Sequence, residues 1–144
     1  MHTPMKIIFI GIGEFALPIL EKLIKNGYNI VKAIRKSVVL DPEEISKLKP
    51  DLIIVASYGK IIPSNILAIP RLGCLNLHPS LLPKYRGPSP IQTAILNNDK
   101  TTGLTIILMD EKIDHGPIIG QKKITISSGE NYQTLEKKNG SNSR

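Results

Sequence analysis

The chain has 144 residues, of which 41% are hydrophobic, and a formal net charge of +7. This length suits one domain that buries about two thirds of its unfolded surface. The single cysteine excludes an internal disulfide and a cysteine metal cluster, and it fits a reducing cytoplasm. A basic balance favours anionic partners, nucleic acid included. The lysines are scattered along the chain, however, so charge alone does not select a function.

The first 34 residues show the patterns of a strand, a helix and a second strand. Residues 6–11 are a nearly continuous apolar run, which is typical of a strand buried on both faces. Residues 15–26 have helical spacing, with Pro18 expected in the first turn, and residues 29–34 resemble a strand. The apolar run is too short for a signal peptide or a membrane span. We therefore expect a cytoplasmic protein that has no membrane partner.

The same alternation continues along the rest of the chain. Asp41 and Pro42 predict the start of a short helix, and Ser64 is predicted to cap a brief helix through residue 67. Further strands are expected at 51–56, 72–77, 103–109 and 118–126, and further helices at 90–96 and 131–138. Together these elements predict an α/β fold with an open, mostly parallel, twisted sheet and flanking helices. The last strand is expected to run antiparallel at an edge, because only a tight turn precedes it.

The stretch GIGEFA, residues 11–16, matches the dinucleotide-binding fingerprint that follows a first strand. Arg35 and Lys36 stand where an acidic ribose-binding residue is expected, which would suit the 2′-phosphate of NADP. Glu14, in contrast, occupies the place that a pyrophosphate would take at the head of the helix. We favour the interpretation that these glycines only let the strand turn into its helix. An NADP-dependent oxidoreductase remains a minor alternative.

Asn76 and His78 lie two residues apart at the end of a predicted strand, so their side chains share one side of the sheet. Ligands bind at the carboxyl ends of parallel strands. An amide that holds a developing oxyanion, beside an imidazole that moves a proton, suits acyl transfer. A structural histidine is the alternative. The loop that follows is restricted by four prolines, which would hold it in one shape against a ligand: Pro79, Pro83, Pro88 and Pro90.

A carboxylate that orients the imidazole is expected nearby. Asp114 lies in the turn between two predicted strands, where it is either a turn former or the partner of His78. Asp110 and Glu111 are competitors that spacing does not exclude. His115 could pair with His78 at a metal ion, but no third or fourth ligand is apparent, and no metal is expected.

The stretch LNLHPSLLPKYRGPSPIQTAILNNDKTTGLTIILMDEKIDHGPII, residues 75–119, strongly resembles the catalytic domain of methionyl-tRNA formyltransferases. Glycinamide ribonucleotide and sugar-nucleotide formyltransferases share the fold of that domain. MKIIFIGIGEFALPILEKLI and KPDLIIVASYGKIIP resemble earlier parts of the same family, so the resemblance covers most of residues 5–126. It implies a Rossmann-like formyltransferase fold, with one catalytic domain over residues 1–138 and a polar tail at 139–144.

The resemblance also implies a site and a reaction. Asn76, His78 and Asp114 would be the catalytic triad, with 10-formyltetrahydrofolate as the formyl donor. Asn76 would stabilise the oxyanion, His78 would shuttle the proton, and Asp114 would position His78 and an ordered water. Further residues match those that line the folate pocket: Tyr58, Gly59, Ile61, Ser80, Leu81, Leu82 and Pro83. The implied acceptor is the amino group of initiator methionyl-tRNA, in translation initiation.

Two departures from the family pattern concern the acceptor. Between residues 35 and 41 the chain omits a basic loop, a helix and a strand that family members carry, roughly 40 residues in such units. In the tRNA enzymes that loop contacts the acceptor stem, and its loss would also expose a sheet edge, which favours dimerisation. The C-terminal β-barrel domain of the family has no counterpart in residues 139–144. A formyltransferase for a smaller amine, such as an amino-sugar nucleotide, and a non-catalytic folate-binding remnant therefore stay open as alternatives.

Overall fold

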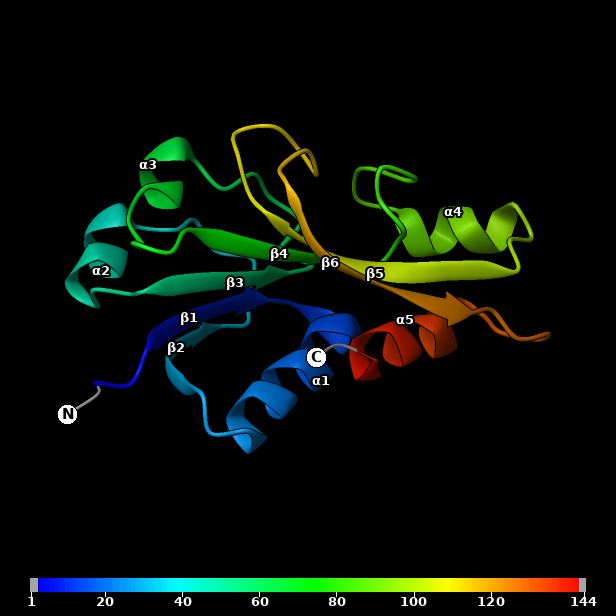
Figure 1. Ribbon diagram of the computed structural model, residues 1–144, viewed down its shortest axis with the longest axis horizontal. Coiled ribbons are helices and arrows are strands. Elements are labelled where there is room, and N and C mark those ends of the chain that lie inside the picture. Colours follow the sequence, from blue (N-terminus) through cyan, green and yellow to red (C-terminus); the bar gives the residue numbers. More distant parts are fainter. Residues whose placement is uncertain (1–2, 143–144) are drawn as a thin grey trace.

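One six-stranded sheet runs through residues 3–142, the part of the chain that the computed structural model describes (Figure 1). Its strands are β1 Lys6–Gly11, β2 Asn29–Ile34, β3 Leu52–Ala56, β4 Cys74–His78, β5 Thr101–Leu108 and β6 Ile118–Thr125. They lie in the order β2-β1-β3-β4-β5-β6. The first four are parallel, whereas β5 is antiparallel to β4 and β6 is antiparallel to β5. The predicted open, mostly parallel α/β sheet and its antiparallel edge strand are confirmed, although the reversal of β5 was not predicted.

Helices cover both faces of this sheet. The helices are α1 Gly13–Lys25, α2 Pro42–Lys47, α3 Ser64–Leu67, α4 Pro90–Leu96 and α5 Tyr132–Ser141. Helices α1 and α5 pack together on one face, and α2 and α3 lie on the other (Figure 1). Side chains of β1 alternate between the two cores: Ile7 and Phe9 belong to the first, Ile8 and Ile10 to the second. This double burial is the reason for the continuous apolar run at the start of the chain.

Three local predictions were wrong at their boundaries. Helix α1 begins at Gly13, two residues earlier than expected, so Pro18 lies inside the helix rather than in its first turn. Ser64 is the first residue of α3 and not its cap, and no side chain caps this helix. Strand β4 begins two residues later than expected because Gly73 still belongs to a turn, in which its N–H donates to the Pro70 carbonyl. The strand ends at His78, the second residue of the predicted Asn-x-His pair.

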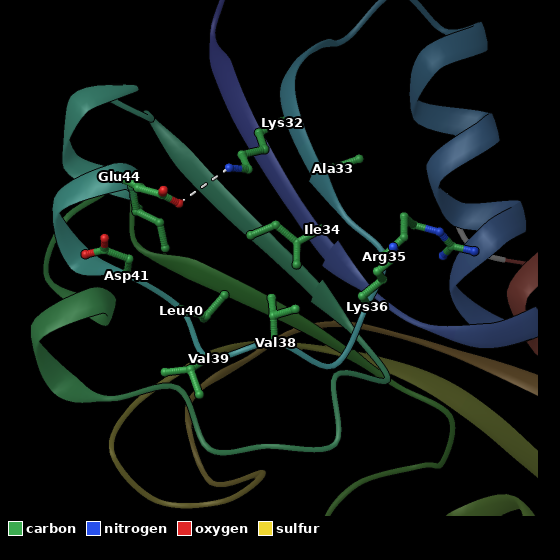
Figure 2. Close-up of a pocket in the computed structure, with 11 residues that line it drawn as sticks. Lys32, Ala33, Ile34, Arg35, Lys36, Val38, Val39, Leu40, Asp41 and Glu44 are labelled. Atoms are coloured by element: carbon green, nitrogen blue, oxygen red, sulfur yellow. Dashed lines mark ion pairs between the residues drawn. The ribbon is translucent and has the colours of Figure 1, made fainter.

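The link between β2 and α2 is short and lies at the edge of the sheet. Within it, the Arg35 guanidinium donates to the Gly11 carbonyl at 3.0 Å, and the Tyr58 hydroxyl donates to the Val38 carbonyl. A cavity of about 310 Å³ lies between β2, this link and α2 (Figure 2). Among the described strands, β2 has a neighbour on one side only, so its other edge is open, as the shortened sequence led us to expect.

Helix α5 has a well-defined start. The Asn131 side chain accepts a hydrogen bond from the Thr134 N–H at 3.0 Å, and the Thr134 hydroxyl accepts one from the Asn131 N–H at 3.0 Å. This reciprocal pair is a capping box, which satisfies two backbone donors that a helix start leaves unpaired. The predicted start of this helix near residue 131 is confirmed.

The predicted polar tail at residues 139–144 was wrong for its first part. Helix α5 continues through Ser141, while residues 143–144 lie outside the described part of the chain. Gly140 permits this extension because α5 packs closely on α1. A side-chain carbon at Gly140 would lie only 2.5 Å from the Phe15 carbonyl oxygen. Tertiary packing against α1 therefore outweighs the low helix propensity of glycine and asparagine here.

Asn139 is an anomaly in this helix. It is fully buried, yet neither its Nδ2 nor its Oδ1 has a hydrogen-bond partner among the described residues. A buried polar group without a partner costs about 1–3 kcal/mol. The Asn139→Leu substitution removes both polar atoms at similar volume, so it should raise the free energy of unfolding by about 1–3 kcal/mol. Urea denaturation measures this change.

The matched control is the same substitution at the helix cap. Asn131→Leu removes the capping box and should lower the free energy of unfolding by about 1 kcal/mol. Opposite signs for the two Asn→Leu changes would confirm that Asn139 is a buried, unpaired amide. An Asn139→Leu protein that is less stable than the parent would contradict this interpretation.

Candidate active site

Strand β4 carries the first two predicted site residues in the middle of the sheet. Asn76 pairs with Val55 of β3 on one side and with Ile107 of β5 on the other, and His78 pairs with Thr105 of β5. Both neighbours are rigid ladder partners, so the backbone of the Asn-x-His pair is held from two sides. The two side chains lie on the same side of the sheet, as their spacing predicted.

Asp114 completes a convergent trio with these residues. Its Oδ1 accepts a hydrogen bond from Asn76 Nδ2 at 3.3 Å and lies 3.5 Å from His78 Nδ1. Its Oδ2 accepts from the Gly87 N–H at 2.7 Å. The Asp114 side chain is only 10% exposed, and that of His78 only 6%. The structure thus brings together the three side chains that the sequence singled out, while their catalytic roles remain a prediction.

The loop between β5 and β6 delivers Asp114 from an unexpected direction. Because β5 is antiparallel to β4, it ends beside the start of β4, where the Met109 N–H donates to the Cys74 carbonyl at 2.8 Å. The loop then folds back along β4, so that Asp114 reaches Asn76 and His78. Asp114 itself has a φ of 49°, a left-handed conformation that aspartate tolerates better than most residues.

The competing carboxylates and the second histidine are engaged elsewhere. Asp110 Oδ2 lies 2.7 Å from His115 Nδ1, and the hydrogen bond from His115, with one from the Lys112 N–H, lowers the pKa of Asp110. Glu111 is exposed. Within residues 3–142, no group of three or more His, Cys, Asp or Glu side chains is placed to hold a metal ion. Spacing left Asp110 and Glu111 open as partners of His78, and the fold selects Asp114.

The loop after β4 is held by side chains that the sequence analysis did not single out. The Thr105 hydroxyl donates to the Ser80 carbonyl at 2.6 Å and accepts from the Leu82 N–H at 3.1 Å. Gln121 Nε2 donates to the Leu82 carbonyl at 2.8 Å. The sequence signal for Thr105 was its place as the one hydroxyl in the predicted strand 103–109, where a buried hydroxyl must find partners. The prolines therefore hold this loop together with two polar side chains, Thr105 of β5 and Gln121 of β6.

The same loop covers His78 on the side away from Asp114. His78 Nε2 lies 2.8 Å from the Tyr85 carbonyl oxygen. The Ser80 hydroxyl donates to the Lys84 carbonyl at 2.7 Å, which closes the turn leading to Tyr85. Both ring nitrogens of His78 therefore face oxygen atoms, one from a carbonyl and one from a carboxylate. This arrangement fixes the plane of the ring.

The residues implied as a folate pocket divide into buried and accessible ones. Tyr58, Ser80 and Leu82 are buried in the protein, and burial raises the pKa of Tyr58. Ile61 is 68% exposed. Leu81 is half-buried, while Gly59 and Pro83 are exposed. The accessible members are thus the ones whose surfaces would meet a ligand, and the buried ones would shape the loops that carry them.

The structure argues against dinucleotide binding, because a side chain already occupies the anion site at the start of α1. The Phe15 N–H, at the start of α1, donates to Glu136 Oε1 of α5 at 3.2 Å. Arg35, the candidate for a 2′-phosphate, donates to the Gly11 carbonyl. A carboxylate already occupies the place that a pyrophosphate would need, and it would repel a second anion. The glycines at 11 and 13 therefore serve the turn from β1 into α1.

Residues 39–142 match the model of the formyl transferase family. This span is more than half of the chain and contains the whole convergent trio. The chain belongs to the formyl transferase family. The match begins at residue 39, within the short link between β2 and α2. None of the helices in the described part of this formyl transferase is long and apolar enough to cross a membrane.

Curated relatives of this formyl transferase confirm the resemblance found in the sequence. A methionyl-tRNA formyltransferase from Thermotoga maritima is 43% identical over 93% of this chain and 53% of its own length. One from Thermodesulfovibrio yellowstonii is 42% identical over 92% of this chain and 54% of its own length. The chain thus spans about half the length of the curated relatives it matches.

The alignment with the Thermotoga maritima relative also bears on the shortened segment. It covers 167 positions, while 93% of a 144-residue chain is about 134 residues. About 33 aligned positions of the relative therefore have no counterpart here. This number is in keeping with the unit predicted to be missing between residues 35 and 41.

Solved structures show the same fold at low sequence identity. A phosphoribosylglycinamide formyltransferase from Bacillus halodurans has a TM-score of 0.77 at 24% identity, and the match covers 93% of this chain and 87% of that one. A sugar N-formyltransferase from a Shewanella species has a TM-score of 0.70 at 22% identity, covering 94% of this chain and 63% of that one. The predicted formyltransferase fold is confirmed.

Cys74, at the start of β4, is not available as a nucleophile. It is buried, and burial raises the pKa of its thiol to about 12. Since the thiolate is the reactive form, a disulfide reagent such as DTNB should not label the native protein at neutral pH. In urea the same reagent should react with the one cysteine and release one equivalent of thionitrobenzoate per chain. Rapid labelling without urea would show that β4 opens and would contradict the rigid placement of the trio.

Proposed function

We propose that this protein transfers a formyl group from 10-formyltetrahydrofolate to an amine, with methionyl-tRNA as the acceptor. The observation that carries the proposal is the convergence of Asn76, His78 and Asp114 on one shielded point of a formyl transferase fold. An amide donor, an imidazole and a carboxylate side by side suit a transfer of an acyl group between two nitrogen atoms.

Each member of the trio has a distinct task in the proposed reaction. Asn76 Nδ2 donates to the formyl oxygen as negative charge builds up there. His78 Nδ1 accepts a proton from the attacking amine and returns it to N10 of the folate as the old C–N bond breaks. Asp114 stabilises the positive charge on His78 between these two events. The distance of 3.5 Å between Nδ1 and Oδ1 is longer than that of a typical direct hydrogen bond.

Methionyl-tRNA is favoured as the acceptor by the names of the similar curated proteins. Relatives at 43% and 42% identity are named methionyl-tRNA formyltransferase. The structures named for glycinamide ribonucleotide and sugar acceptors are 24% identical or less among those compared above. The net charge of +7 also suits a polyanionic substrate.

A smaller amine, such as an amino-sugar nucleotide, is the second candidate. It is favoured by the short link between β2 and α2, because about 33 positions of a methionyl-tRNA formyltransferase have no counterpart in this chain. A protein that binds folate without catalysis would have the same missing segment. These two kinds of protein and a methionyl-tRNA formyltransferase differ in the fate of the formyl group on a bound donor.

A transfer assay distinguishes these candidates. The protein is supplied with 10-formyltetrahydrofolate and either methionyl-tRNA or an amino-sugar nucleotide, and tetrahydrofolate release and the formylated product are followed. We expect transfer to methionyl-tRNA only. Transfer restricted to the nucleotide would overturn the proposed acceptor, and folate binding without any transfer would favour the non-catalytic alternative.

The His78→Ala substitution tests the proposed proton transfer. Loss of a general acid–base group should lower kcat/KM by at least about 100-fold. The matched control is His115→Ala, because His115 is exposed and bonded to Asp110 rather than to the trio. Circular dichroism should show an intact fold for both variants. Activity that survives His78→Ala would rule out His78 as the proton carrier.

A further inference from the structure

The Tyr85 carbonyl decides which nitrogen of His78 carries a proton. A carbonyl oxygen only accepts hydrogen bonds, so His78 Nε2, at 2.8 Å from it, must be the donor. In a neutral imidazole the other nitrogen then has the lone pair. That nitrogen, Nδ1, is the one that faces Asp114. The ring is therefore held as a base that points toward the trio.

Tyr85 holds its carbonyl in place through an unusual backbone conformation. Its φ is 59°, in the left-handed region that a bulky residue rarely adopts. Such a conformation persists only when the surroundings enforce it. Hydrogen bonds of the side chain hold this conformation. The Tyr85 hydroxyl donates to Asp99 Oδ2 at 2.6 Å and accepts from Asn97 Nδ2 at 3.0 Å. Both partners lie in the turn between α4 and β5.

Three further contacts hold the loop around Tyr85. The Lys84 ammonium lies 4.9 Å from the centre of the Tyr85 ring and 3.4 Å from Asp99 Oδ2. Two residues after Tyr85, the Gly87 N–H donates to Asp114 at 2.7 Å. One short loop thus contacts His78 through a carbonyl and Asp114 through an N–H. Its position sets the placement of the two groups relative to each other.

We propose that Tyr85, anchored by Asp99, is a positioning residue that fixes His78 as the tautomer with its proton on Nε2 and its lone pair on Nδ1. Tyr85 acts through its carbonyl and does not itself touch the reacting atoms. The kinetic consequence rests on the proposed formyl transfer, whereas the tautomer is a property of the protein alone. The two are therefore tested by separate measurements.

The tautomer is read by nuclear magnetic resonance. Long-range ¹H–¹⁵N correlation of histidine rings distinguishes a protonated from an unprotonated ring nitrogen. The His78 signals are assigned by their loss in His78→Gln, which separates them from those of His2 and His115. At a pH where the ring is neutral, we expect one tautomer with the proton on Nε2. A proton on Nδ1 in the unmodified protein would overturn the proposal.

Substitutions at the anchor test the role of Tyr85. Tyr85→Phe removes the hydroxyl, and Asp99→Ala removes its acceptor, so each should yield a mixture of His78 tautomers. Asp99→Asn retains an oxygen that accepts from the tyrosine, so it should keep the single tautomer. Tyr28→Phe, at an exposed tyrosine between α1 and β2, is the matched control and should behave as the unmodified protein.

The kinetic measurement follows from the same set of variants. Tyr85→Phe and Asp99→Ala should lower kcat by about tenfold with little change in KM, because a part of the protein would then hold His78 in the wrong tautomer. Asp99→Asn should restore most of the rate. Tyr85→Phe and Asp99→Ala proteins that fold and retain both the single tautomer and the full kcat would overturn the proposal. An inactive parent protein with a proton on Nε2 would refute the proposed function and leave the positioning role intact.

Discussion

The carboxylate of Asp114 is the interaction on which the candidate site depends. It accepts hydrogen bonds from Asn76 on β4 and from Gly87 in the following loop, and it faces the ring of His78. A shielded carboxylate without partners would be costly, so the folded chain places these groups around it. Strand β4, the loop that follows it and the distant loop between β5 and β6 thus meet at this carboxylate.

The reversal of β5 makes this contact possible. A strand parallel to β4 would need a long crossover, whereas an antiparallel strand begins beside the end of β4 and finishes beside its start. The next loop then returns along β4 and carries Asp114 over the two side chains. The same reversal brings Thr105 of β5 opposite His78, where its hydroxyl holds the loop that covers the ring. The reversal of β5 thus places both the Asp114 carboxylate and the Thr105 hydroxyl that holds the loop.

The shortened edge and the candidate site lie in different parts of the sheet. The short link joins β2 to α2, and two strands, β1 and β3, separate β2 from β4 (Figure 1). The trio retains its hydrogen bonds in a chain in which about 33 aligned positions of a relative have no counterpart. The open side of β2 and the cavity beside it lie at this edge, whereas the ring of His78 is held by the loops around β4 and β5.

The sequence alone was sufficient for the type and order of most elements, because apolar periodicity and capping residues act over a few neighbouring positions. It was also sufficient to single out Asn76 and His78, since residues two apart on one strand must share a face. Spacing alone did not distinguish Asp114 from Asp110, and only the family resemblance favoured Asp114. The sequence did not indicate the roles of Thr105, Gln121 and Tyr85. These assignments depend on how the chain returns between β5 and β6 and on which loop covers the histidine. Contacts of this kind join positions far apart in the sequence, and only packing of the complete sheet selects among them.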